Sequence, residues 1–244
     1  MMQRTMARKR MLALALPIAA MLSPGCGEAP ATHPDAEALL AEPSPAEPRT
    51  EAAVVAAFDG YRLAAADGRG ADALEYVHEP YYDLVRHHLD LVLDADRDDV
   101  EALSFADRYM VLSLRMRVAP ERLRTITPRA LAELAIEEGW LSQLALTHAE
   151  VDRVVLLPEG HESPWRAEIF LSALGQQGRT PMPMFYEGGG WKIDLKTLFE
   201  RAAPQQERMA EMLGPDADAI ILRGIAAKDG IDVPEDVYAP IGRE

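Results

Sequence analysis

Two ionisable residues four positions apart, Asp83 and His87, are the closest match in this chain to a pair that could move protons. Residues at this spacing share a helix face, where a carboxylate can orient an imidazole as a general base. Asp90 and Asp94 continue the same face, so a solvated acidic surface is the more economical interpretation. The neighbouring His88 lies about 100° further round the helix and is interpreted as a residue at the margin of the core.

Aromatic residues are the second chemical feature. A ring with one polar atom suits an amphipathic ligand, but it suits core packing equally well, and packing is the preferred interpretation. If the fold encloses a cavity, Asp59 and Tyr76 join Asp83 and His87 as candidate acid or base groups, because burial shifts pKa values and raises that of a carboxyl group towards neutrality. The candidate pocket residues are Phe58, Tyr61, Tyr81, Tyr82, Met184, Tyr186 and Trp191.

The acidic residues do not form a complete metal motif. Asp94, Asp96 and Asp98 have the spacing that opens a calcium-binding loop, but Asp99 stands at position six and Phe105 at position twelve, where that loop needs glycine and glutamate. No phosphate-binding loop or nucleophile elbow is present. We expect no metal and no cofactor.

The first 26 residues predict export. Four basic residues within the first ten precede an apolar run from Met11 to Leu22, which is the composition of a secretory signal. Gly25-Cys26 follows, and this ending resembles the lipobox of bacterial lipoproteins, although Ser23 stands where that motif usually has leucine. The resemblance implies a lipid on Cys26 that anchors the protein to the cell envelope. The alternative is a cleaved leader with a free Cys26.

Composition limits the partners. The chain has a formal net charge of −15, and without residues 1–25 it carries 21 Lys and Arg against 40 Asp and Glu, which is −19. Nucleic acid is excluded as a partner, because its binding depends on cations that neutralise phosphates. Cys26 is the single cysteine, so no intramolecular disulfide can form.

Periodicity predicts helices first, strands next and helices again. Residues 26–50 are rich in Pro, Ala and Glu and are interpreted as a tether. Helical spacing begins at Glu51, and two caps are expected, at Ser104 and at Thr127 before Pro128. Short alternating runs follow, at 151–157, 165–174, 179–187 and 191–195, as an antiparallel meander. Pro181 and Pro183 argue against a central, fully paired position for the third run.

The final helices are expected at 198–213 and 216–228. This order predicts an α+β fold in which helices pack on a curved antiparallel sheet. The predicted organisation is a signal peptide at 1–25, the tether at 26–50, a cone-shaped α+β domain at 51–200 and a C-terminal helical extension at 201–244.

The segment from Phe185 to Leu195, with a glycine turn before a Trp-led strand, resembles the final hairpin of the nuclear transport factor 2-like superfamily, also called the cystatin-like cone fold. The resemblance covers residues 51–200. It implies a curved sheet that wraps around helices and encloses an apolar pocket. It does not imply one function, because the superfamily includes dehydratases, isomerases and cyclases as well as non-catalytic binding modules.

Three functions stay open at this point. The preferred one is a non-enzymatic, lipid-anchored envelope protein that binds a small apolar or amphipathic ligand, or a protein partner. The second is a cofactor-independent isomerase, dehydratase or cyclase that uses a buried Asp, His or Tyr. The third is a structural module that forms a homodimer through the sheet.

Overall fold

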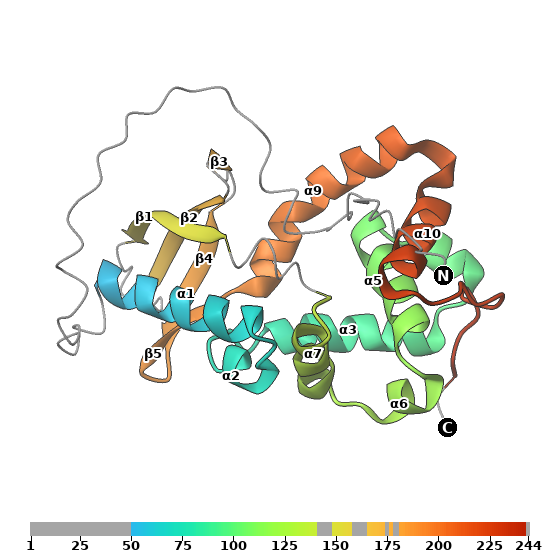
Figure 1. Ribbon diagram of the computed structural model, residues 1–244, viewed down its shortest axis with the longest axis horizontal. Helices are drawn as coiled ribbons and strands as arrows, with labels where there is room; N and C mark the ends of the chain where they lie inside the picture. Colours follow the sequence, from blue (N-terminus) through green and yellow to red (C-terminus); the bar gives the residue numbers. More distant parts are fainter. Residues whose placement is uncertain (1–49, 141–147, 158–164, 174–175, 178–180, 243–244) are drawn as a thin grey trace, which may run out of the picture.

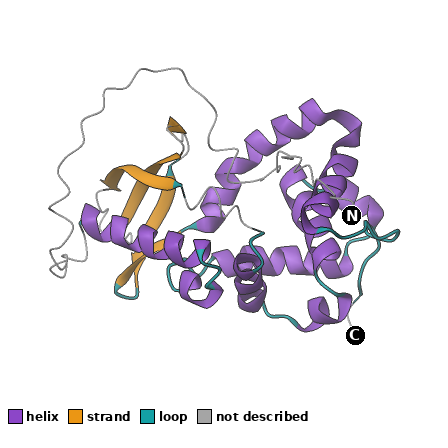
Figure 2. Ribbon diagram, in the orientation of Figure 1, coloured by secondary structure: helices purple, strands orange, loops and turns teal. Residues whose placement is uncertain are grey.

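The computed structural model describes residues 50–140, 148–157, 165–173, 176–177 and 181–242. The predicted leader, Cys26 and the tether up to residue 49 lie outside the described residues. A sheet with helix α1 along it occupies one end of the molecule, and a cluster of helices occupies the other (Figure 1; in Figure 2 the strands are orange and the helices of both ends are purple). Within the described residues, no helix is both long enough and apolar enough to cross a membrane.

Helix α1 (Glu51–Ala66) covers the inner face of the sheet. Thr50 caps it by accepting a hydrogen bond from the backbone of Ala53, and its buried face includes Val54, Phe58 and Tyr61. Helix α2 (Gly70–Leu74) follows and packs against α1 and α7. Gly70 lies so close to the backbone of α7 that an added Cβ would meet a carbonyl oxygen at 2.6 Å, so only glycine fits there.

The helical cluster is built from α3, α5 and α7, with two short helices between them. The caps expected at Ser104 and Thr127 are confirmed, because each side chain accepts a backbone hydrogen bond at its helix start. A capping box formed by Asp96 and Asp99 starts one short helix, which explains part of the acidic run there. The bounds are α3 Tyr81–Asp94, α4 Arg97–Ala102, α5 Phe105–Arg117, α6 Pro120–Thr125 and α7 Pro128–Glu137.

The sheet is an antiparallel meander with strand order β1-β2-β4-β5, and the short β3 pairs with β2. A bulge between Val151 and Arg153 interrupts the pairing of β1 with β2. The strands are β1 Ala149–Leu157, β2 Arg166–Ala173, β3 Gln176–Gln177, β4 Met182–Glu187 and β5 Gly190–Ile193. The predicted meander is therefore confirmed.

The third run lies at the centre of the sheet, contrary to the expectation from its prolines, but it is not paired along its full length on both sides. Pro183 lies in β4, which has β2 on one side and β5 on the other. The pairing of β4 with β5 ends at Met184 and Ile193, so the missing N–H of Pro183 falls just past that ladder. The Pro183 carbonyl still accepts a hydrogen bond from the backbone of Asp194.

Helix α9 (Leu195–Leu213) leaves the end of β5 and runs to the helical cluster (Figure 1). It starts three residues earlier than expected because the Asp194 side chain caps it by accepting from Thr197. The helix is continuous across residues 200 and 201, where the sequence analysis placed a domain boundary. A short 3₁₀ turn, η3 (Gly214–Asp216), leads into α10 (Ala217–Asp229).

A buried arginine ties α3, α5 and the C-terminal segment together. The Arg115 side chain is 8% exposed and donates hydrogen bonds of 2.6–3.4 Å to the carbonyls of Leu91, Val92, Ala95 and Val237. Burial lowers its pKa, and within the described residues no carboxylate pairs with it. Its charge therefore faces the negative end of the α3 dipole.

Taken together, these elements confirm the expected fold class. The protein is α+β, with helices packed on a curved antiparallel sheet and further helices at its C-terminal end.

Candidate functional site

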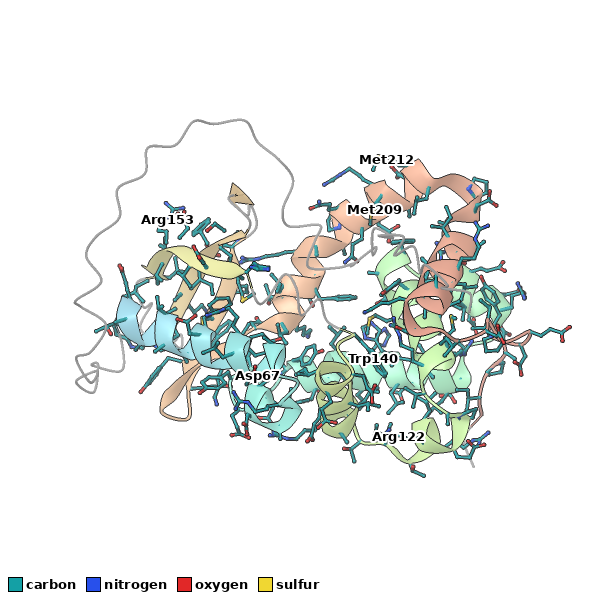
Figure 3. The ribbon with its side chains drawn as sticks, viewed as in Figure 1. Asp67, Arg122, Trp140, Arg153, Met209 and Met212 are labelled. Atoms are coloured by element: carbon teal, nitrogen blue, oxygen red, sulfur yellow. The ribbon has the colours of Figure 1, made fainter. Side chains whose placement is uncertain are left out.

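An apolar hollow of about 100 Å³ lies among α3, α5, α7 and the first turns of α9, and we call it the helical pocket. It is not between the sheet and α1. Trp140, labelled in Figure 3, borders the pocket just after the end of α7. The other lining residues are Tyr81, Leu84, Val85, His88, Tyr109, Met110, Ser113, Leu114, Arg117, Leu131, Ala132, Ala135 and Phe199.

His88 lines the helical pocket and is paired with a carboxylate, that of Asp107. His88 is 2% exposed, and its Nε2 lies 3.0 Å from Oδ1 of Asp107. The other carboxylate oxygen of Asp107 accepts a hydrogen bond of 2.7 Å from the Ser104 hydroxyl. The His88 ring also meets the edge of Phe199, with centroids 5.4 Å apart. The imidazole is therefore held by one carboxylate and one ring.

The pair has an electrostatic consequence. The hydrogen bond from His88, followed by that from Ser104, holds the pKa of Asp107 below its usual value, although partial burial acts in the opposite direction. Asp107 thus stays an acceptor, and the Nε2 side of His88 is committed to it.

Ser113 lines the same pocket from α5 and is 4% exposed. Its hydroxyl has no hydrogen-bond partner within the described residues. A buried hydroxyl without a partner costs free energy, so it is an unusual feature of a folded protein. Among the described residues that line the hollow, Ser113 is the only one with a buried polar side-chain atom that lacks a hydrogen-bond partner.

Two further polar side chains at the pocket, Arg117 and Tyr81, add no unpaired charge to it. Arg117 donates from Nε to Asp229 at 2.6 Å, and its guanidinium lies 5.6 Å from the ring centroid of Trp140. Burial raises the pKa of Tyr81 to about 12, so its hydroxyl is neutral at physiological pH. The pocket therefore presents no unpaired formal charge among its described lining residues.

The four candidate catalytic residues do not line the helical pocket. Asp83 and His87 are exposed, and Asp83 pairs with Arg86 at 2.8 Å. Asp59 pairs with Arg62 at 3.1 Å on the surface of α1. Tyr76 packs over Gly60, where an added Cβ would lie 2.4 Å from its ring.

The seven candidate pocket residues are divided between three places. Tyr81 lines the helical pocket. Tyr82 lines a second hollow, described below, and Arg129 donates to its hydroxyl at 3.4 Å. The other five lie beside the sheet: Phe58, Tyr61, Met184 and Trp191 are buried in the core, and Tyr186 packs edge-on against Trp191 with centroids 5.6 Å apart.

A second hollow, the polar groove, lies where the starts of α3 and α7 meet the β4–β5 hairpin and has a volume of about 570 Å³. His78 stacks on Phe185 with centroids 4.6 Å apart, and its Nδ1 lies 2.9 Å from Oε2 of Glu187. Asp83 and Arg86 also line the groove and pair with each other. The lining of the groove carries charges of both signs, and its Arg129 pairs with Glu75, which is not part of the lining. The groove therefore selects no single ligand chemistry.

Sequence reasoning missed the partnership of His88 with Asp107 and the roles of Ser113 and Phe199. A signal for His88 did exist, because it lies on the apolar side of α3. Nothing in the sequence pairs it with Asp107, which is 19 residues away. Among the described residues there is no group of three or more His, Cys, Asp or Glu side chains that could hold a metal ion.

Comparison with known proteins adds no relative: no family model, curated protein or solved structure matches this chain.

Proposed function

We propose that this protein binds a small apolar or amphipathic ligand in the helical pocket, without catalysing a reaction on it. The observation that carries this proposal is the buried Ser113 hydroxyl, which has no partner within the described residues and lines an otherwise apolar hollow. A ligand that supplied one hydrogen bond would remove the cost of that hydroxyl and fill the hollow.

The charge of the protein fits this proposal better than it fits a nucleic-acid or phosphate site. The chain is strongly acidic, and the lining cation Arg117 is already paired with Asp229. Both effects would make the binding free energy of an anionic ligand less favourable.

The leader supports an exported location, with a lipid on Cys26 that anchors the protein to the membrane of the cell envelope. The test is metabolic labelling with a radioactive fatty acid. We expect the label on the natural chain and none on a Cys26→Ser variant, and an unlabelled natural chain would remove the anchor from the proposal.

The imidazole–carboxylate pair of His88 and Asp107 is the one observation that favours an enzyme instead. Such a pair can act as a general base if a substrate reaches the second ring nitrogen. A cofactor-independent isomerase, dehydratase or cyclase is therefore the second candidate. Turnover of a bound small molecule that disappears in a His88→Gln variant would replace the binding proposal.

Ligand binding itself is tested by incubating the purified protein with envelope extract and identifying what co-purifies. The matched control is Ala135→Leu, which adds three carbons to the pocket wall from α7. We expect a small apolar compound with the natural protein and its loss from the variant. The same compounds on both proteins, or none on either, would contradict the proposal.

A further inference from the structure

The size of the helical pocket limits its occupant. Its volume is about 100 Å³, whereas an apolar protein cavity of about 150 Å³ accepts benzene. Half-buried residues such as Met110 and Trp140 lie at its border, so a single ring or a short chain fits with small side-chain shifts. A fused-ring molecule or a whole acyl chain exceeds the hollow.

The charges around the pocket exclude an ionised occupant. The lining side chains Arg117 and His88 each have a partner already, because Arg117 bonds to Asp229 and His88 bonds to Asp107. A carboxylate or an ammonium group would lose its hydration there without finding a counterion, and such desolvation is costly. The favoured occupant is neutral.

One polar atom of the pocket, the hydroxyl oxygen of Ser113, is available for a hydrogen bond to a ligand. The Ser113 hydroxyl can donate one hydrogen bond and accept others, and within the described residues it makes none. The Nε2 of His88 cannot serve it, because this atom already faces Asp107. A neutral oxygen group on the ligand matches this single requirement.

We infer that the helical pocket selects a neutral molecule with one ring or a short chain and a single uncharged oxygen group that hydrogen-bonds to Ser113. This inference rests on the proposed ligand-binding function and names the chemical class of its ligand. Phenol is the simplest probe of that class, with benzene and benzoate as its apolar and anionic counterparts.

The experiment measures the binding of phenol, benzene and benzoate to the full chain by ligand-detected NMR. Two variants accompany the natural protein. Ser113→Ala removes the unpartnered hydroxyl, whereas Tyr109→Phe removes another hydroxyl from the pocket wall and keeps the ring. Circular dichroism spectra of both variants check that each keeps the fold.

We expect phenol to bind more tightly than benzene, and benzoate to bind at least about tenfold more weakly than phenol. Ser113→Ala should weaken the binding of phenol by about three- to tenfold, which corresponds to the loss of one hydrogen bond, and leave the binding of benzene unchanged. The effect of Ser113→Ala on the binding of phenol should exceed that of Tyr109→Phe.

The outcomes separate the inference from the function on which it rests. If phenol and benzene bind equally and Ser113→Ala changes neither, or if Tyr109→Phe has the larger effect, the role of Ser113 is wrong while the pocket remains a binding site. If benzoate binds more tightly than phenol, the inference that the ligand is neutral is wrong, while the pocket again remains a binding site. If none of the three probes binds, both the inference and the proposed function fail.

Discussion

The sheet end and the helical end of this molecule differ in how completely they are packed. Between α1 and the sheet, large side chains such as Phe58, Met184 and Trp191 leave almost nothing exposed. Among α3, α5 and α7, a hollow remains, and a buried histidine and a buried serine face it. A pocket was expected inside the curve of the sheet. The difference teaches that this space is filled by the same side chains that were expected to line the pocket.

The filled end is expected to be the more sensitive one to lost volume. Phe58→Ala removes a fully buried ring from the core between α1 and the sheet and should lower the free energy of unfolding by about 3–5 kcal/mol. Urea unfolding measures this loss. A loss below about 1 kcal/mol would mean that the sheet end is not closely packed and would break the comparison.

The helical end depends on a different kind of contact. Arg115→Met removes the guanidinium that the carbonyls of α3 and Val237 bond to, and it should cost about 3 kcal/mol because those buried acceptors lose a charged donor. The neighbouring Arg117→Met, which breaks a pair with Asp229, should cost less because that carboxylate is more exposed. Equal losses in urea unfolding would contradict this ranking.

Adding volume should cost more stability at the sheet end than at the helical end. Ala64→Leu in α1 overfills a core in which Ala64 is 2% exposed and should cost about 1–3 kcal/mol. Ala135→Leu in α7 extends into the helical pocket and should change stability by less than about 1 kcal/mol, in either direction. The two melting temperatures test this directly, and equal destabilisation would show that the hollow cannot accept atoms.

The smallest expected effect concerns pH at the helical end. The pKa of Asp107 is lower in the folded protein, so its contribution to stability is present above the unfolded pKa and is lost as the pH falls through the folded pKa. Asp107→Asn should therefore lower stability at pH 6 by less than about 1 kcal/mol, because solvent screens this partly exposed group.

Comparison of unfolding curves at pH 6 and pH 2.5 provides the check. The difference between the natural protein and the Asp107→Asn variant should shrink at the lower pH. A difference that grew on acidification would mean that Asp107 is not stabilised as a charged group by His88.

Sequence alone predicted what local chemistry decides. Caps at Ser104 and Thr127 and the alternating strands follow from neighbours within a few residues, and the structure confirms them. The central place of Pro183 could not be predicted, since it depends on where β5 stops.

The candidate site was less accessible to sequence reasoning. The exposed Asp83 and His87 matched a helical pattern, whereas the pair in the structure joins the buried His88 of α3 to the partly exposed Asp107 of α5. Phe199 reaches the same pocket from α9, far along the chain. Such contacts depend on how helices cross, and no spacing in a single sequence encodes them.

The C-terminal segment has a consequence for the order of folding. Arg115 meets the carbonyls of α3 across 20–24 residues, but it meets Val237 across 122, and the backbone of Gly242 donates to Leu93 from still further away. Closing so long a loop is slow compared with pairing adjacent helices. During synthesis the joint between α3 and α5 can therefore form first, and the helical end is completed only when the last segment has left the ribosome and docked.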